Sequence, residues 1–233
     1  MGGLTLVPTP IGNLDDITIR ALNTLREADA ILCEDTRHTM KLIKHHDVSN
    51  KLIAFHQHNE HKITERLVEE MKAGTNYALV SDAGTPGISD PGYLLSRACI
   101  EADVQVTVLP GPTAVIPAVV GSGMACEKYV YLGFPPQKKG RQTFWSTLSE
   151  ETRTMVMYES PHRIAKALRE AAEIFGEDRN ACVARELSKI HETYHRGSLS
   201  ELKAHAESTP FKGEIVLVIE GLAQFEKRTK KKD

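Results

Sequence analysis

Residues 81–92 read SDAGTPGISDPG and form a dense polar turn. A P-loop needs a lysine before Ser or Thr, and a dinucleotide fingerprint needs GxGxxG at the start of a helix. The turn has neither, it lacks the second acid of an aspartyl phosphatase, and its Asp82 and Asp90 would repel a phosphate. Carboxylates and hydroxyls on a rigid turn suit the hydroxyls of a ribose, so the turn favours a nucleoside cofactor without phosphates.

Three more polar turns follow apolar segments in the first half of the chain: residues 8–13 (PTPIGN), 34–37 (EDTR) and 56–60 (HQHNE). In open α/β sheets, ligands bind beyond the carboxyl ends of the strands. We therefore expect these turns to gather around one crevice with residues 81–92. Taken singly, each is also compatible with an ordinary connecting loop.

The second half contains three segments that place acids beside bases: residues 158–163 (YESPHR), 185–189 (RELSK) and 212–214 (KGE). A carboxylate that can accept a proton, next to arginines that can bind RNA phosphate, fits a cleft between two domains. Paired surface charges are the alternative, and the sequence leaves it open.

His56, His58 and His61 have the spacing HxHxxH, which matches no established metal-site pattern, and no cysteine lies near them in the sequence. We therefore expect a polar loop or a substrate contact there and no metal. The four cysteines are widely spaced without a CxxC pair, which indicates reduced, mostly buried thiols. No signal peptide and no run of about 18 apolar residues is evident, so we expect a cytoplasmic protein without a membrane span.

Basic residues are concentrated in two places, although the chain has 29 basic against 31 acidic residues and a net charge of −2. This balance argues against nonspecific coating of nucleic acid. One cluster is QKKGR at residues 137–141, and the other is the end of the chain, residues 227–232 (KRTKKK). Both are either solvated segments or mobile contacts for a polyanion such as RNA.

The elements that position these turns alternate in the first half. Short apolar segments at residues 4–7, 30–33, 51–55, 77–80 and 104–109 predict strands, and helical periodicity separates them, beginning near Asp15 and over residues 36–46. Strands alternating with helices predict an α/β domain with a mostly parallel sheet. The second half has more closely spaced strands, including residues 154–158, 181–185 and 215–219, so we expect a mixed sheet.

Pro110-Gly111-Pro112 and the Gly-, Pro- and Ala-rich segment after it mark a domain boundary. We predict an N-terminal α/β domain over residues 1–112, a C-terminal α/β domain over residues 113–226 and a basic tail over residues 227–233.

The motifs VPTPIGNLDDIT, EDTRHT, FHQHNE, SDAGTPGISDPG, LPGPTA, YESPHR, ARELSK and KGE occur in this order between positions 7 and 214. In this set the chain resembles the ribosomal RNA small-subunit 2′-O-methyltransferases of the tetrapyrrole (corrin/porphyrin) methylase superfamily. The resemblance covers the chain except its basic tail. It implies a two-domain α/β fold, S-adenosyl-L-methionine (SAM) in a cleft between the domains, and a homodimer.

The resemblance also implies cofactor contacts. Related porphyrin methylases carry a GGDP turn and a PGVTS turn, and residues 83–86 and 110–114 match these at equal separation, with Thr85 in place of the aspartate. The cofactor-binding residues implied by the resemblance are Pro8, Asp82, Ala83, Gly84, Thr85, Pro86, Thr113, Ala114, Tyr158, Ala184, Arg185, Glu186 and Gly213.

The implied reaction is methylation of the ribose 2′-hydroxyl of a decoding-centre cytidine in 16S rRNA of the small ribosomal subunit. A ribose hydroxyl is a poor nucleophile near neutral pH, so a general base should help. The candidates for the base are Glu34, Asp35, Glu159 and Glu186, and Asn13, Arg37 and Arg163 would position the ribose or its phosphate. The predicted RNA contacts are His56, His58, Lys138, Lys139 and Arg141.

Two other functions stay open on the sequence. The first is methylation of a tetrapyrrole carbon by the same fold, although the chain lacks GGDP. The second is a cofactor-binding RNA chaperone without catalysis.

Overall fold

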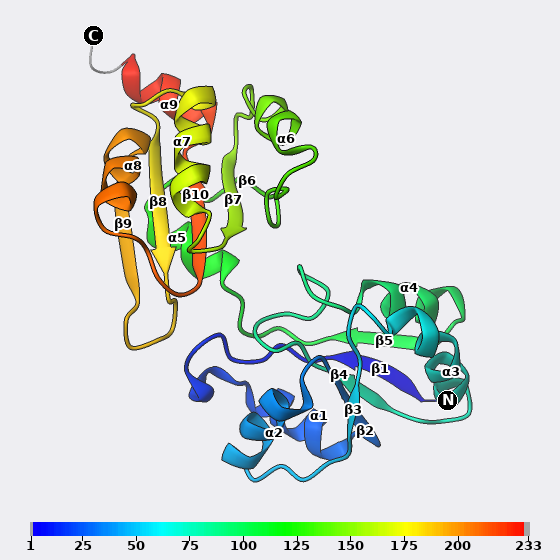
Figure 1. The fold of residues 1–233 in the computed structure, drawn as a ribbon. Helices are drawn as coiled ribbons and strands as arrows, with labels where there is room; N and C mark the ends of the chain where they lie inside the picture. The colour runs from blue at the N-terminus through cyan, green and yellow to red at the C-terminus, as the bar shows by residue number, and fades with distance from the viewer. Residues whose placement is uncertain (1, 231–233) are drawn as a thin grey trace. The chain divides into compact units, whose positions relative to one another are not determined.

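The computed structural model describes residues 2–230. It divides into two compact units, Met1–Thr113 (unit 1) and Ala114–Asp233 (unit 2) (Figure 1). Each unit has its own sheet and its own buried apolar core. No helix in the described part of the chain is long and apolar enough to cross a membrane.

Unit 1 is built on a parallel five-stranded sheet with the order β3-β2-β4-β1-β5. Because all five strands are parallel, their carboxyl ends lie at the same edge. The elements are β1 (Gly3–Leu6), a 3₁₀ turn η1 (Leu14–Asp16), α1 (Ile19–Glu27), β2 (Ala30–Cys33), α2 (Thr36–His45), β3 (Leu52–Ala54), α3 (Glu60–Lys72), β4 (Tyr77–Leu79), α4 (Tyr93–Glu101) and β5 (Gln105–Val108).

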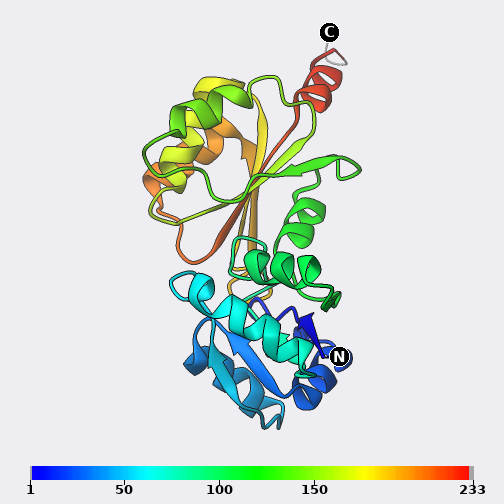
Figure 2. The ribbon, with the colours of Figure 1, turned by 90° about the vertical axis from the view of Figure 1, so that its right-hand side faces the viewer.

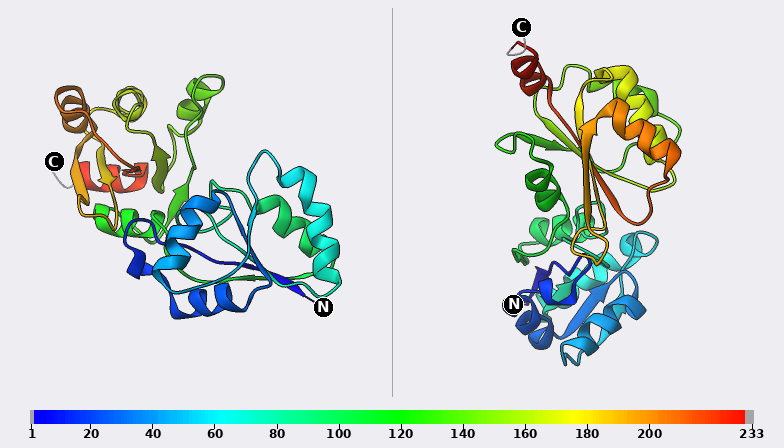
Figure 3. Two further views of the ribbon diagram at one scale, coloured as in Figure 1. Left: turned by 60° about the horizontal axis from the view of Figure 1, so that its bottom comes forward. Right: turned by 90° about the vertical axis from the view of Figure 1, so that its left-hand side faces the viewer.

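Successive side chains along the strands of unit 1 point to opposite faces of the sheet, and each face is covered by its own buried apolar cluster. On β2, Leu32 points into the cluster with Leu67 and Leu95 of α3 and α4, whereas Ile31 points into the cluster with Leu25 of α1. The helices accordingly cover both faces, α1 and α2 on one side and α3 and α4 on the other (Figure 3). The predicted mostly parallel α/β sheet is confirmed.

The first helix of unit 1 begins later than the acids near Asp15 predict. Residues 14–16 form η1, capped by the Asn13 side chain, and α1 starts at Ile19. The Thr18 hydroxyl accepts a hydrogen bond from the amide of Ala21 at 3.0 Å, which satisfies an otherwise free donor of the first turn. The true cap is therefore Thr18.

Unit 2 has a mixed five-stranded sheet with the order β6-β7-β10-β8-β9, in which β6 and β7 are parallel and the other pairs are antiparallel. This confirms the mixed sheet. The elements are α5 (Val115–Ser122), β6 (Tyr129–Tyr131), α6 (Arg141–Thr147), β7 (Thr154–Glu159), α7 (Ile164–Phe175), β8 (Asn180–Arg185), β9 (Thr193–Ser198), α8 (Leu199–Ser208), β10 (Ile215–Ile219) and α9 (Leu222–Thr229).

Helices α6, α7 and α8 cover one face of the unit 2 sheet, and α5 packs on the other (Figure 2). Helix α5 is not predicted from the sequence, because the Gly- and Pro-rich composition of this segment suggests a loop. Pro117 is the third residue of α5, within the first turn, where a missing amide donor costs no helical hydrogen bond. A left-handed Gly123 (φ 75°) ends the helix.

Helix α9 extends into the segment predicted as a basic tail. It ends at Thr229, so Lys227 and Arg228 are helical. Arg228 also forms an ion pair of 3.0 Å with the fully buried Glu220. Residues 231–233 lie outside the described part of the chain.

Candidate active site

Three of the four polar turns that the sequence predicts to gather, residues 8–13, 34–37 and 81–92, are joined by hydrogen bonds at the carboxyl edge of the unit 1 sheet, and His56 of the fourth affects the pKa of Glu34. Thr9, after β1, and Gly84, after β4, exchange two backbone hydrogen bonds of 2.9 Å. The Thr85 hydroxyl donates to the carbonyl of Pro112, after β5, at 3.2 Å. The backbone amide of Asp35, after β2, donates to Asp82 Oδ1 at 3.2 Å. Four turns distant in sequence are therefore joined directly.

Two positions in these turns require glycine. Gly84 has φ 81°, a conformation that strains any residue with a Cβ. A Cβ on Gly111 would lie 2.8 Å from the Cβ of Pro8, closer than real Cβ contacts allow. The backbone at Gly111 consequently lies closer to the Pro8 ring than a residue with a Cβ would permit.

Three carboxylates lie together at this edge: Glu34, Asp82 and Asp90. Burial, followed by the charges of Glu34 and Asp82, raises the pKa of Asp90 to about 6. Burial and the charge of Asp82 also raise the pKa of Glu34, while His56 partly opposes them. The edge is thus an acidic site that favours a cationic ligand. Its carboxyl groups on Glu34 and Asp90 bind protons more readily than ordinary carboxyl groups do.

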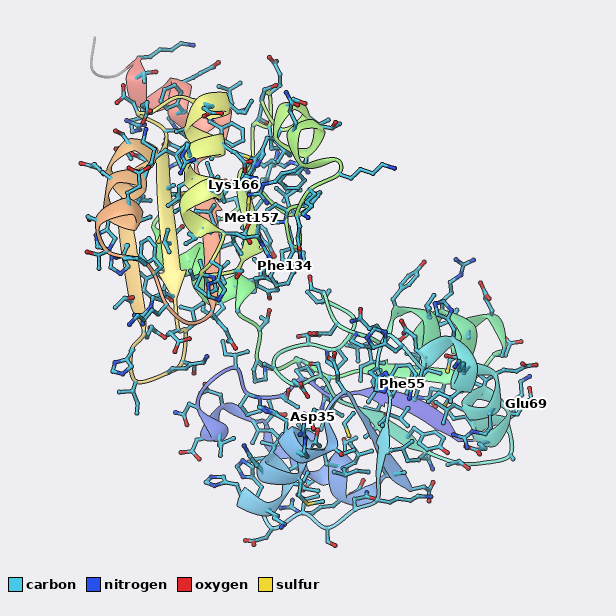
Figure 4. The ribbon with its side chains drawn as sticks, viewed as in Figure 1. Asp35, Phe55, Glu69, Phe134, Met157 and Lys166 are labelled. Carbon is cyan, nitrogen blue, oxygen red and sulfur yellow. The ribbon has the colours of Figure 1, made fainter. Side chains whose placement is uncertain are left out.

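Asp35 and Arg37 have a different role from that of Glu34. Asp35 caps α2 through the amide of Arg37 (2.8 Å) and also binds its guanidinium, with Arg37 Nη2 at 2.7 Å from Asp35 Oδ2. These hydrogen bonds from Arg37 hold the pKa of Asp35 well below its usual range. Asp35 is therefore a poor proton acceptor, and Figure 4 labels it among the turns of unit 1.

Asn13 and the predicted histidines also lie in these turns. The Asn13 side chain accepts from the amide of Asp15 and shapes the turn after β1. His56 follows β3, packs edge-on to the exposed His58 with 5.9 Å between ring centroids, and has a buried Nδ1 without a hydrogen-bond partner among the described residues. Within residues 2–230, no group of three or more His, Cys, Asp or Glu side chains is arranged to hold a metal.

In unit 2, Glu159 ends β7 inside a buried ionic network. It is 2% exposed, and its Oε1 accepts from Arg163 Nε at 2.9 Å while Oε2 lies 3.5 Å from Arg141 Nη1. Arg141 also donates to Glu170 at 2.7 Å, and the Trp145 indole donates to the same carboxylate at 2.8 Å. Two arginines therefore form ion pairs with the buried Glu159 carboxylate.

The expected solvated position is wrong for Arg141. This residue is 3% exposed, because its guanidinium is engaged by Glu159, by Glu170 and by the carbonyl of Pro136 at 3.0 Å. Lys138 and Lys139 of the same predicted RNA-binding set are exposed. Arg141 is therefore not available at the surface to contact RNA.

Glu186, at the end of β8, is tightly bound as well. Its Oε1 accepts from the backbone amide of Glu214 at 2.8 Å and from Lys189 Nζ at 3.0 Å, and these contacts lower its pKa. Gly213 has φ 82°, and a Cβ there would overlap the Glu186 carboxylate. Glu186 therefore links the end of β8 to the segment before β10, and its carboxyl group is ionised.

The remaining predicted cofactor residues lie at strand ends or in turns of their own units. Pro8 and Pro86 are buried, Ala83 is exposed, and Thr113 is half-buried in unit 1. In unit 2, Ala114 precedes α5, Tyr158 is half-buried on β7, and Ala184 and Arg185 end β8. Asp90 is not among the residues predicted from the sequence to form the site, although it lies in the same polar turn as Asp82 and acts with Glu34 and Asp82 here.

Comparison with known proteins adds an independent observation. Residues 3–203 match the family described as Tetrapyrrole (Corrin/Porphyrin) Methylases. Three proteins named Ribosomal RNA small subunit methyltransferase I are similar over most of their length: 48% identical in Synechocystis sp. (95% of this chain, 80% of that protein), 46% in Escherichia coli O157:H7 (94% and 78%) and 44% in Thermotoga maritima (95% and 99%).

Solved structures share the fold at lower identity. The uroporphyrin-III C-methyltransferase of Thermus thermophilus complexed with S-adenosylhomocysteine superposes with a TM-score of 0.65 at 16% identity, covering 94% of this chain and 97% of that one. The methyltransferase CobJ gives 0.71 at 18% identity, covering 96% and 95%. The family match over most of the chain, and relatives at 44–48% identity, establish that this chain belongs to the tetrapyrrole (corrin/porphyrin) methylase family.

Proposed function

We propose that this protein uses SAM to methylate the ribose 2′-hydroxyl of a decoding-centre cytidine in 16S rRNA. The observation that carries the proposal is the acidic, glycine-lined edge of unit 1, in a chain 44–48% identical to proteins named small-subunit ribosomal RNA methyltransferases. A cytoplasmic homodimer acting on the small ribosomal subunit completes the proposal.

The residues at this edge fit SAM. SAM carries a positive sulfonium and an ammonium group, and Glu34, Asp82 and Asp90 supply negative charge. At Gly84 the positive φ excludes a Cβ, and at Gly111 a Cβ would meet Pro8, so neither position places a side chain at this edge. A phosphate-bearing cofactor would be repelled by the same carboxylates. When bound, SAM supplies an electrophilic methyl group, so the protein has mainly to align the acceptor and remove its proton.

Among the four candidates for the general base, the environment favours Glu34. Asp35, Glu159 and Glu186 are each engaged by an arginine, a lysine or a backbone donor that stabilises the carboxylate. Glu34 is half-buried and its pKa is raised, which brings it closer to the neutral range in which a base works best. We propose that Glu34 accepts the proton of the 2′-hydroxyl, with Asn13 and Arg37 positioning the ribose or its phosphate. Arg163 stays in the proposal as a second positioning group.

Proposed RNA contacts come from both units. The exposed His58 and the half-buried His56 follow β3 in unit 1, and Lys138 and Lys139 lie in the loop after β6 in unit 2. The cofactor contacts predicted in unit 2, among them Tyr158 and Gly213, remain a prediction from the resemblance.

The function is tested by incubating the protein with methyl-labelled SAM and either small ribosomal subunits, naked 16S rRNA or a porphyrinogen. We expect label in RNA, and mass-spectrometric mapping should place it on the 2′-oxygen of one cytidine. Label in the macrocycle alone would identify a tetrapyrrole methylase. An RNA 2′-O-methyl pattern that is unchanged in cells lacking the gene would support the chaperone alternative.

The role of Glu34 is tested with Glu34→Gln, which keeps the size of the side chain but cannot accept the proton. We expect the rate of methylation at saturating substrate to fall by about 10²- to 10⁴-fold. Because the carboxylate must be ionised, the wild-type rate should fall as the pH drops through the raised pKa of Glu34, and the variant should lose this dependence.

The matched control is Glu27→Gln, on the exposed side of α1, which should keep the wild-type rate. SAM binding by each variant is measured by calorimetry, so that a loss of cofactor is not mistaken for a loss of the base. A Glu34→Gln rate within about threefold of wild type would reassign the base.

A further inference from the structure

An exposed aromatic side chain stands at the end of β6, in the loop that precedes α6. Phe134 is 52% exposed, and its ring packs on Tyr158 of β7 with 5.4 Å between centroids and an interplanar angle of 56°. Tyr158 in turn packs on Tyr131 of β6, with 5.3 Å between centroids. Phe134 is thus supported from within unit 2 while much of its surface remains open to solvent, and Figure 4 labels it near the end of β7.

The backbone that carries Phe134 is held at both ends. On one side, the carbonyl of Gly133 accepts from the amide of Tyr158 at 2.9 Å, and Gly133 has φ 63°. On the other side, Arg141 donates through Nη1 to the carbonyl of Pro136 at 3.0 Å and through its amide to the carbonyl of Lys138 at 3.2 Å. The loop is therefore held in place before any ligand arrives, which lowers the entropic cost of binding.

The loop is held by a buried charged residue. Arg141 is buried at 3% exposure between Glu159 and Glu170, and a buried charge is tolerated only where it is paired. The loop nonetheless presents Phe134, Lys138 and Lys139 to solvent. Neither lysine forms an ion pair with any residue between positions 2 and 230. The rigid network thus presents one aromatic ring and two unpaired cations.

We propose that Phe134 is a stacking surface for an unpaired base of the RNA substrate, with Lys138 and Lys139 holding phosphates beside it. This inference rests on the proposed function, because it names how the RNA is held. Proteins that read single-stranded RNA combine exposed aromatic faces with cations, since every base has a stacking face and every nucleotide a phosphate. A second copy of the chain is a less suitable occupant, because in a symmetric contact the two lysines of this loop would meet the same two lysines of the partner.

The test measures binding of a short single-stranded RNA that contains one cytidine in a purine-free context, and of the same RNA with that base removed. Phe134→Ala should weaken binding of the intact RNA by about 5- to 150-fold, the range of one base–aromatic stack. It should have a much smaller effect on the abasic RNA. Phe134→Trp should retain binding, because it keeps a flat ring.

The matched control is Tyr129→Ala, an aromatic residue with 36% exposure at the start of β6, which should bind RNA as the wild type does. Phe134→Leu is a second test variant: it keeps apolar bulk for folding but lacks the flat ring, and it should bind about as weakly as Phe134→Ala. The fluorescence of Trp145, the single tryptophan, verifies that unit 2 stays folded.

Binding by Phe134→Ala or Phe134→Leu within twofold of wild type would overturn the stacking role, and the proposed function would stand if the wild type still methylates rRNA. Equal losses on intact and abasic RNA would also overturn it. A change in oligomeric state of Phe134→Ala in solution would assign the ring to a protein contact and overturn it as well. Failure of the wild type to methylate rRNA would instead count against the proposed function.

Discussion

At the scale of single residues, neighbours decide what each carboxylate can do. Asp35 and Asp82 lie in adjacent turns, yet Asp35 is held ionised by Arg37, whereas Asp82 raises the pKa of both Glu34 and Asp90. The difference arises because an arginine stabilises the charged form, and a second carboxylate together with burial destabilises it. Which carboxylate can accept a proton therefore depends on which side chains meet in the folded chain.

The effect of burial and neighbouring carboxylates can be tested at Asp90 without measuring activity. Its pKa is about 6 in the folded protein and about 3.9 when unfolded, so between these values the folded state binds more protons and the free energy of unfolding falls as the pH rises. Ionised Asp90 is thus a net cost above pH 6. Asp90→Asn, which removes that charge, should stabilise the protein at pH 8 by roughly 1 kcal/mol, after discounting for solvent screening, or about 2–4 °C in melting temperature.

The gain should disappear near pH 4, where Asp90 is protonated in the folded protein. Scanning calorimetry at both pH values measures it, with the exposed Glu173→Gln of α7 as a control that should change little at either. A stabilisation that is the same at pH 4 and pH 8 would show that charge repulsion is not its cause.

At the scale of elements, a buried ionic network holds the loop between β6 and α6 in place. The loop after β6 has no regular structure, and Arg141 at the start of α6 connects it to Glu159 at the end of β7 and to Glu170 on α7. Three elements are joined by one guanidinium. Such a network stabilises the structure only while it is complete, because each partner is costly when buried alone.

Arg141→Met should therefore be strongly destabilising. Methionine fills much of the space but leaves Glu159 and Glu170 without this cation, and we expect a loss of about 3–5 kcal/mol in the free energy of unfolding of unit 2. Urea denaturation followed by Trp145 fluorescence measures this loss, and trypsin should cut faster at Lys138 and Lys139.

The control is Arg169→Met, whose pairing with Glu207 at 3.9 Å is largely exposed and should contribute less than about 1 kcal/mol. If the two variants lose the same stability, the buried network is not what holds the loop.

At the scale of the whole molecule, the charge is nearly balanced, so any RNA binding must come from local clusters. The chain has 29 basic and 31 acidic residues, and Lys138 and Lys139 form one of its two basic clusters. Each phosphate neutralised by a protein cation releases counterions, which makes the binding constant fall with salt. The salt dependence thus counts the contacts that the cluster makes.

The binding constant falls with salt, and the slope of its logarithm against log salt should become less steep by about 1.4 in the double variant Lys138→Gln/Lys139→Gln. This is the loss of two phosphate contacts at roughly 0.7 each on single-stranded RNA. Filter-binding titrations over a range of salt concentrations measure the slope. The control with equal loss of charge is Lys72→Gln/Lys203→Gln, in which both lysines form ion pairs with glutamates. Equal slopes for the two double variants would assign the effect to net charge and not to this loop.

The sequence by itself determined the local features of this protein. Short apolar runs separated by amphipathic helices predicted a parallel sheet, and polar turns after its strands predicted convergence at one edge, because both depend on periodicity and on strand direction. It missed α5, whose Pro117 and glycines suggest a loop, since only packing against the unit 2 sheet stabilises that helix. The tertiary structure alone decided that Arg141 is buried and that Asp90 joins Glu34, because burial and the approach of distant side chains depend on how the elements pack.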